Sequence, residues 1–236
     1  MPATAPVQFV TRFEDKIIHN EKFVEYHFEM ETPHRLEFAA GQYVSVKVAE
    51  TGERRSYSLC SAPSIDHGFE LLLDISPGGL GTQRLESLQY GERLEGIGPL
   101  GNFVISTQPE SAISLIATGS GIAPLKSMLL DLVEKRDPRP ITLYWGMRNA
   151  QHLFWLDEIQ DIVEATTNVS FYPVISQPNS EWTLSTGHVT DLLSVHQFPQ
   201  DTGYYVCGSK EITESIQQFL LEKSIAPEYI HHEAFV

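Results

Sequence analysis

The sequence predicts a two-domain protein in which an antiparallel β-barrel is followed by an α/β domain with a parallel sheet. Its 236 residues suit two modest domains better than one large domain. Short β-like runs separated by turn residues fill the first hundred residues. From Ser111 onward, strand and helix patterns alternate. We therefore expect one domain at 1–108 and a second at 109–236.

The first domain is expected to be a barrel because its β-like runs are short and evenly spaced. Turn signals such as Ala40-Gly41-Gln42 and His67-Gly68 separate the runs. The expected strands are Val7–Phe13, Phe23–Met30, Tyr43–Val48, Ser56–Cys60, Phe69–Ile75 and Arg93–Ile97. Only Gly81–Leu88 has the pattern of a short helix.

The second domain has the repeated strand, turn and helix order that is typical of a parallel sheet with covering helices. The expected strands are Ala112–Ala117, Ile141–Met147, Val169–Ile175, Tyr204–Cys207 and Tyr229–His232. The expected helices are Ile122–Lys135, His152–Ala165, Gly187–Val195 and Glu211–Lys223.

Composition excludes several classes of function. The formal net charge of −15 argues against non-specific nucleic-acid binding, which depends on lysine and arginine. No apolar run reaches the roughly 20 residues that a membrane helix needs, and the amino terminus lacks the pattern of a secretory signal. We therefore expect a cytoplasmic protein without a membrane span, and we expect a monomer.

The two cysteines, Cys60 and Cys207, are expected to be free thiols on separate buried strands. Two thiolates cannot hold an ordinary iron–sulfur cluster, so a one-electron relay would sit on another protein. The nine histidines do not show the spacing of a zinc or iron site, and we predict no metal site.

The run Arg54–Cys60 is the first candidate site. Alternation along a strand places Arg55, Tyr57 and Leu59 on one face, with Ser56 and Ser58 on the other. An arginine can hold an anion, and a neighbouring aromatic ring can stack on a flat ligand. An ordinary edge strand with a surface arginine explains this stretch equally well.

Two glycine-rich turns are further candidates. Gly79, Gly81 and Thr82 lead into the short helix, where glycines and N–H groups suit a phosphate; a plain hairpin turn is the alternative. The segment 118–124 joins a strand to a helix, the setting of a dinucleotide pyrophosphate site. Pro124 replaces the third glycine of the usual fingerprint, so a turn that binds nothing remains an alternative.

Five motifs that occur together and in order indicate a family. They are Arg55-x-Tyr57-Ser58, Gly79-x-Gly81-Thr82, Gly119-Ser-Gly-Ile-Ala-Pro124, Cys207-Gly208 and Glu233-Ala-Phe235. In this combination the chain resembles the ferredoxin-NADP reductase superfamily over nearly its whole length. The stretch 141–153 is also similar to bacterial NAD(P)H-flavin reductases.

The resemblance implies a flavin site, with FAD as cofactor, on the first domain. Arg55 would pair with a flavin phosphate, Tyr57 would pack on the isoalloxazine, and Ser58 would hydrogen-bond near N5. Ser56 belongs to the same strand. Gly79, Gly81 and Thr82 would approach and bind the pyrophosphate.

The resemblance also implies an NAD(P)H site on the second domain. Thr118 would stand beside the flavin ring, and Cys207 would lie against the nicotinamide. Glu233 would complete the polar surroundings, and Phe235 would shield the flavin until nicotinamide displaces it. The remaining nucleotide-binding positions are Gly119, Gly121, Pro124, Ser176 and Gly208. Ser58, Cys207 and Glu233 would surround the hydride transfer.

The function implied is transfer of a hydride from NAD(P)H to bound FAD in the cleft between the domains, followed by electron transfer to a separate acceptor. Ferredoxin or flavodoxin is the first acceptor class, and free flavin or a partner oxygenase is the second. An electron-transfer subunit active only within a complex is the alternative of another class. Gln177 stands after Ser176 where NADPH-dependent relatives have arginine, which favours NADH, although Arg148 and Lys210 could compensate.

Overall fold

The computed structural model describes residues 5–235. Residues 1–4 and 236, which form the outer ends of the two predicted domains, lie outside the described part. Contacts between Cα atoms divide the chain into two compact units. Unit 1 comprises Met1–Ile105 with Lys126–Leu132, and unit 2 comprises Ser106–Leu125 with Val133–Val236.

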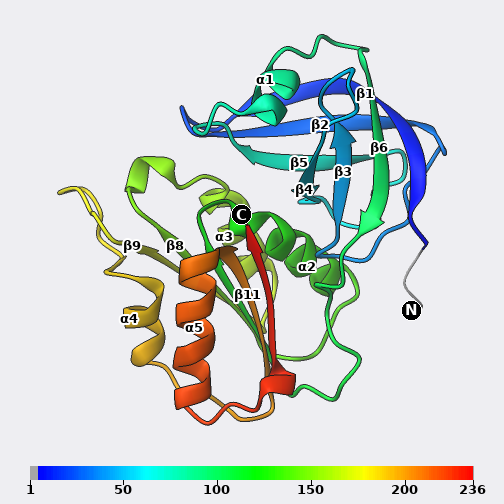
Figure 1. Ribbon diagram of the computed structural model, residues 1–236. Helices are drawn as coiled ribbons and strands as arrows, with labels where there is room; N and C mark the ends of the chain where they lie inside the picture. Colours follow the sequence, from blue (N-terminus) through cyan, green and yellow to red (C-terminus); the bar gives the residue numbers. More distant parts are fainter. Residues whose placement is uncertain (1–4, 236) are drawn as a thin grey trace. The chain divides into compact units, whose positions relative to one another are not determined.

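Unit 1 is built on one six-stranded antiparallel sheet that curls into a nearly closed barrel (Figure 1). The strands occur in the spatial order β4-β3-β6-β1-β2-β5, and an isolated bridge between Leu59 and Leu71 links the two ends of that order. The elements are β1 (Val7–Ile18), β2 (Phe23–Thr32), β3 (Tyr43–Lys47), β4 (Arg54–Ser58), β5 (Gly68–Asp74), α1 (Leu80–Glu86) and β6 (Arg93–Leu100).

The alternating pattern of β2 explains how the barrel is filled. Val24, Tyr26 and Phe28 are buried in one core cluster, because side chains two positions apart share a face of a strand. Phe28 and Phe69 bring their rings to 5.5 Å between centroids, joining the inner faces of β2 and β5. Aromatic contacts of this kind add to the free energy gained from burial.

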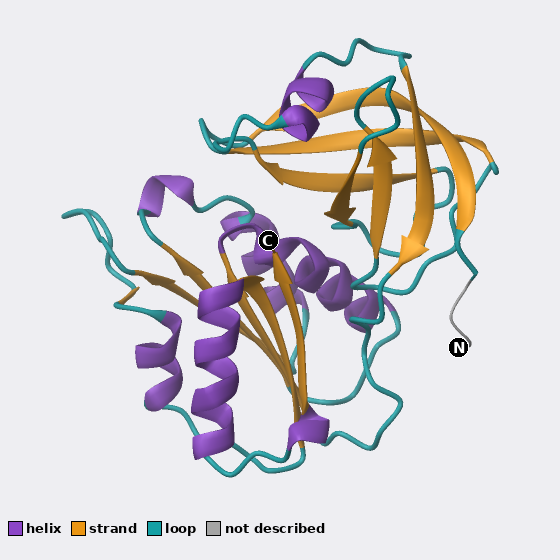
Figure 2. Ribbon diagram, in the orientation of Figure 1, coloured by secondary structure: helices purple, strands orange, loops and turns teal. Residues whose placement is uncertain are grey.

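Unit 2 contains a six-stranded parallel sheet in the order β10-β9-β8-β7-β11-β12. Figure 2 shows its strands alternating with helices, in contrast to the strand-rich unit 1. The strands are β7 (Ala112–Thr118), β8 (Ile141–Met147), β9 (Val169–Ile175), β10 (Ser185–Thr186), β11 (Thr202–Ser209) and β12 (Ile230–Phe235). The helices in this part of the chain are α2 (Ile122–Glu134), whose residues Lys126–Leu132 group with unit 1, α3 (Leu156–Ala165), α4 (Val189–Ser194) and α5 (Lys210–Glu222). Short 3-10 turns lie at Gly119–Gly121, Ala150–His152 and Pro227–Tyr229.

Helices α4 and α5 cover one face of this sheet. Leu193 of α4 and Ile216 of α5 are buried in the same cluster as Ile116 and Val206, which lie on β7 and β11. The doubly-wound arrangement places the carboxyl ends of the parallel strands at one edge of the sheet, where ligands of such folds bind.

The predicted two-domain fold class is confirmed, and one helix boundary is wrong. The sequence predicts a helix from His152, but α3 begins at Leu156. Trp155 caps the helix with a φ of 56°, a left-handed conformation that the helix cannot include. Residues Ala150–His152 form a separate 3-10 turn instead.

Cys60 and Cys207 are both buried thiols outside any disulfide, one in each unit. Among the helices of residues 5–235, none has the length and apolar character required to cross a membrane.

A buried polar network ties the beginning of unit 2 to its sheet. The carboxylate of Glu110 is fully buried and accepts hydrogen bonds from the Tyr205 hydroxyl at 2.9 Å to each oxygen. His231 Nε2 lies 3.0 Å from the same carboxylate, and Arg139 lies 3.5 Å from it. The Tyr205 oxygen in turn accepts the Ser106 N–H at 2.7 Å. Because the carboxylate is buried, the Tyr205 hydroxyl and the Arg139 guanidinium offset part of its desolvation.

Replacing Tyr205→Phe should lower the free energy of unfolding of unit 2 by about 1–3 kcal/mol, because the Glu110 carboxylate and the Ser106 N–H each lose a partner. Urea unfolding followed by tryptophan fluorescence measures this change, since all three tryptophans belong to unit 2. Tyr172→Phe is the matched control, because that side chain is 37% exposed. Equal stability of the two variants would contradict the assigned role of the network.

Candidate active site

The first group of predicted site residues lies on β4 of unit 1. Arg55 is exposed, and Tyr57 is half-buried against the barrel core. Ser56 is exposed and Ser58 is buried. Pairing of β4 with β3 sets this strand in place, with Tyr57 opposite Val44. The Arg55 and Tyr57 side chains are thus held on one face, at the rim of the barrel core.

Helix α1 begins directly against these two side chains. A Cβ atom added at Gly81 would lie 2.0 Å from the Tyr57 hydroxyl oxygen and 3.0 Å from Arg55 Cγ. Only glycine allows so close an approach without displacing the tyrosine. Gly79 is the N-cap of α1, and no side chain caps the helix there. Thr82 is buried in the same turn.

The electrostatics of this group suit an anion. Burial raises the pKa of Tyr57 to about 12, although the Arg55 charge opposes the rise, so the hydroxyl remains protonated at neutral pH. Arg55 adds an exposed guanidinium that donates to the Arg54 carbonyl at 2.7 Å. A Cβ added at Gly78 or Gly79 would meet nothing within 4 Å, so space is open beside the turn. The open space thus lies beside a cation, a neutral hydroxyl and N–H groups that no side chain caps. Together these groups fit the pyrophosphate of FAD.

The second group lies in unit 2, where β7 ends and α2 begins. Gly119 follows Thr118 with a φ of 55°, a left-handed conformation that favours glycine. The indole N–H of Trp145 donates to the Gly119 carbonyl at 3.1 Å and holds this turn in place. Pro124 is the third residue of α2, within the first turn, where proline is tolerated.

The turn after β7 packs against the carboxyl end of β11. A Cβ added at Gly121 would lie 2.2 Å from the Cys207 carbonyl oxygen, and one added at Gly208 would lie 2.1 Å from Thr118 Oγ1. Both contacts would force main-chain or side-chain movement. The structure therefore brings Thr118, Gly121, Cys207 and Gly208 together at the carboxyl edge of the sheet, where a nucleotide can approach the main chain.

Cys207 and Glu233 are opposite each other on β11 and β12. Burial, with a smaller contribution from the Glu233 charge, raises the pKa of the Cys207 thiol well above its ordinary value. A neutral thiol is a poor nucleophile, so Cys207 is suited to contact and not to covalent chemistry. Phe235 lies farther along β12, opposite Ser209, and is half-buried.

Ser176 follows β9, and its N–H donates to the Met147 carbonyl at 3.0 Å. The next residue, Gln177, accepts a hydrogen bond from Arg148 Nε at 3.1 Å. Lys210, at the start of α5, lies 3.9 Å from Glu214. Both cations that could contact a 2′-phosphate thus already have a partner on this chain.

Sequence reasoning missed one residue of this group. Trp145 holds the Gly119 turn, but its position within an apolar strand indicates only a core aromatic. The one signal in the sequence was the resemblance of the surrounding stretch 141–153 to flavin reductases, which assigned this tryptophan no role.

Two family models match the chain, and together they cover most of it. The model of an oxidoreductase FAD-binding domain matches residues 11–105. The model of an oxidoreductase NAD-binding domain matches residues 115–218.

Curated relatives include a phenol 2-monooxygenase reductase component from Pseudomonas sp., which is 31% identical over 88% of this chain and 61% of the relative. A propane 2-monooxygenase reductase component from Mycolicibacterium goodii is 29% identical over 86% of this chain and 60% of the relative. The chain therefore spans about three fifths of the length of these relatives.

Among solved structures, an Amycolatopsis cytochrome P450 reductase superposes with a TM-score of 0.89 at 26% identity, covering 98% of this chain and 70% of that one. A ferredoxin NADP+ reductase from Neisseria gonorrhoeae, solved with FAD and NADP, gives a TM-score of 0.85 at 21% identity and covers 96% of this chain and 98% of that one. The latter likeness concerns the fold. The chain thus matches an oxidoreductase FAD-binding domain and an oxidoreductase NAD-binding domain, and its fold is that of a ferredoxin NADP+ reductase.

Proposed function

We propose that this protein is a reductase that takes a hydride from NAD(P)H onto bound FAD and passes electrons to a separate acceptor. The main support for this proposal is that each unit has a cluster of residues suited to binding one dinucleotide. In unit 1, Arg55 and Tyr57 converge on the start of α1. In unit 2, the turn after β7 meets the end of β11.

The residues of unit 1 would bind and orient the flavin. Arg55 neutralises phosphate charge, and the Tyr57 hydroxyl, protonated at neutral pH, donates a hydrogen bond beside Gly81. Ser58, at the buried end of β4, is assigned to the edge of the flavin ring near N5. Bound FAD would supply the redox chemistry, since a flavin accepts a hydride and can release its electrons singly.

The residues of unit 2 would bind and position the nicotinamide nucleotide. Gly119 and Gly121 let the pyrophosphate approach the main chain at the start of α2. Cys207 provides a small, neutral surface for the nicotinamide, and Glu233 provides a polar group beside it. None of these residues needs to act as a nucleophile. Their contribution would be alignment of the two rings.

The acceptor that we favour is an oxygenase component or a ferredoxin. The support is that relatives are named as reductase components of a phenol and a propane monooxygenase, and as the electron transfer component of an anthranilate dioxygenase. Flavodoxin and free flavin are the acceptors with which these two must be compared.

We further propose that NADH is the preferred coenzyme. Gln177 stands where an arginine would bind a 2′-phosphate, and Arg148 is engaged with Gln177 itself. Lys210 faces Glu214. The residue that follows Ser176 is thus a neutral glutamine, and it is hydrogen-bonded to Arg148.

Replacing Arg55→Ala should reduce the flavin content of the purified protein several-fold, because the phosphate loses its cation. The ratio of absorbance at about 450 nm to that at 280 nm measures the content. Arg12→Ala, which removes an exposed arginine paired with Glu31, is the control and should keep full occupancy. Full occupancy in both variants would remove Arg55 from the site.

Replacing Gly121→Ala should raise KM for NADH about 10-fold or more and leave flavin content unchanged, because the new Cβ would collide with the Cys207 carbonyl. Steady-state kinetics with ferricyanide as acceptor measure this change. Ser120→Ala alters the neighbouring residue without that collision and should behave like the parent protein. A KM that Gly121→Ala leaves unchanged would refute the nucleotide site.

Anaerobic titration tests the proposed function as a whole. The purified protein should be yellow and should bleach with NADH at lower concentration than with NADPH. Gln177→Arg should shift that preference toward NADPH, since it adds a cation for the 2′-phosphate. Colourless protein that takes up no FAD, or flavin that neither nucleotide bleaches, would overturn the proposal. A screen of ferredoxin, flavodoxin, free FMN and an oxygenase component would then identify the acceptor.

A further inference from the structure

Polar side chains gather on the outer face of the barrel sheet, where β2 and β5 pair. Val24 and Tyr26 of β2 face the core, so Glu25 and His27 face outward. His27 is directly opposite Glu70 of β5 in the strand register. Glu25 is only 4% exposed despite its outward position. A buried carboxylate on such a face requires groups that stabilise its charge.

The Glu25 carboxylate lies between two histidines. His27 Nε2 is 3.1 Å from Oε1, and His19 Nε2 is 2.9 Å from Oε2. His19 follows β1 directly, and its N–H donates to the Phe23 carbonyl at 3.0 Å, which fixes the turn that carries it. The carboxylate is therefore oriented from both sides by side chains on its own hairpin.

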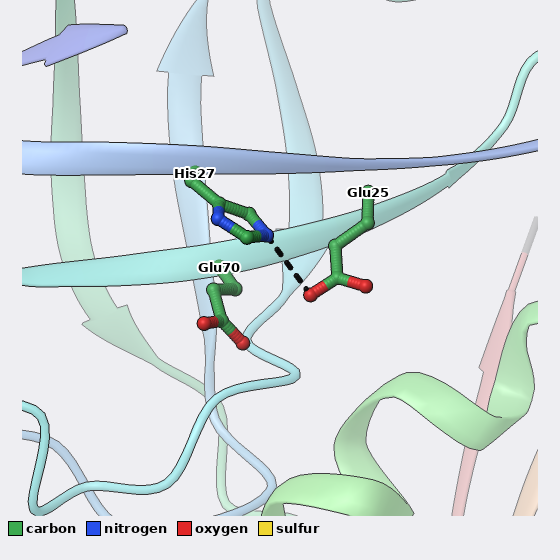
Figure 3. A group of neighbouring side chains, drawn as sticks. All are labelled: Glu25, His27 and Glu70. Carbon is green, nitrogen blue, oxygen red and sulfur yellow. Dashed lines mark hydrogen bonds and ion pairs between the residues drawn. The ribbon is translucent and has the colours of Figure 1, made fainter. Parts of the chain in front are cut away.

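Glu70 completes the group from the neighbouring strand. Its main chain is fixed on both sides: its N–H donates to Ser61 Oγ at 3.1 Å, and its carbonyl accepts the Cys60 N–H at 3.0 Å. Figure 3 shows the ends of the Glu25, His27 and Glu70 side chains pointing toward one another. One ligand atom from each of the three lies within 4.8 Å of the other two.

The chemistry of this group matches a metal ion better than an organic ligand. Two carboxylate oxygens and one imidazole nitrogen are common ligands of first-row divalent transition metals. Bonds of about 2.0–2.2 Å to one ion place ligand atoms about 3–4 Å apart, which small side-chain rotations of this group would achieve.

We propose that Glu25, His27 and Glu70 form a binding site for one divalent transition-metal ion such as Zn²⁺. His19 orients Glu25, as the neighbours of metal ligands commonly do. Three protein ligands leave a coordination position for water. The ion would connect β2 to β5 and is a component additional to the flavin and the nucleotide. The spacing of histidines in the sequence does not predict this site, because Glu70 reaches it only through strand pairing.

Isothermal titration calorimetry of the full flavin-loaded chain, after EDTA treatment and desalting, tests the proposal with ZnCl₂ as titrant. One ion per chain should bind with a Kd in the micromolar range or tighter, and MgCl₂ should bind far more weakly. His27→Gln and Glu70→Gln should each weaken Zn²⁺ binding about 10-fold or more. Both side chains are partly exposed, and His19 still contacts the buried Glu25 carboxylate in the His27→Gln variant.

Matched controls use residues beside the group. Glu29→Gln changes the next outward-facing carboxylate of β2, and His67→Gln changes an exposed histidine just before β5; both variants should bind like the parent protein. Co²⁺ provides a second readout, because coordination by His27 should give visible absorption bands that His27→Gln abolishes. Absence of Zn²⁺ binding in the parent protein, or binding that both His27→Gln and Glu70→Gln leave unchanged, would overturn the proposal. Flavin absorbance and circular dichroism identify any variant that fails to fold.

Discussion

The close packing of the β7 turn against the end of β11 is the constraint on which the nucleotide side of this protein depends. Gly121 lies against the Cys207 carbonyl, and Gly208 lies against the Thr118 hydroxyl, at distances that leave no room for a Cβ. These contacts fix where α2 starts and hold its first N–H groups at the carboxyl edge of the sheet. The same contacts fix Cys207, and through strand pairing Glu233, at the position that we propose for the nicotinamide.

In unit 1, close packing at a glycine likewise fixes the start of a helix. Its helix α1 approaches Tyr57 only because residue 81 is glycine, and the tyrosine is in turn packed against the barrel core. Aromatic packing between β2 and β5 thus supports the same sheet whose rim carries Arg55. The outer face of those two strands carries Glu25, His27 and Glu70, so one pair of strands contributes both to the core and to a second polar group.

Much of this architecture follows from local sequence patterns. The change from short alternating runs to alternating strands and helices gives the fold class, because side-chain periodicity reports which faces are buried. The glycines and the arginine of the candidate sites could be named only because five motifs occur together and in order and resemble a known family. Contacts made by pairing of distant segments could not be predicted. Trp145 reaches Gly119, Tyr205 reaches Glu110 and Glu70 reaches His27 only after the sheets form. The left-handed Trp155 gives no sequence signal either, so the start of α3 was misplaced.

The central claim is that this chain moves a hydride directly from the nicotinamide to its bound flavin. Anaerobic stopped-flow measurement of flavin bleaching with NADH and with NADH deuterated at both C4 positions tests that claim most directly. We expect several-fold slower bleaching with the deuterated nucleotide at saturating concentration, because the bond from C4 to deuterium breaks during transfer. We also expect that no deuterium is lost to solvent from the product nucleotide. Bleaching that requires a second protein, or that proceeds without consuming the nucleotide, would contradict it.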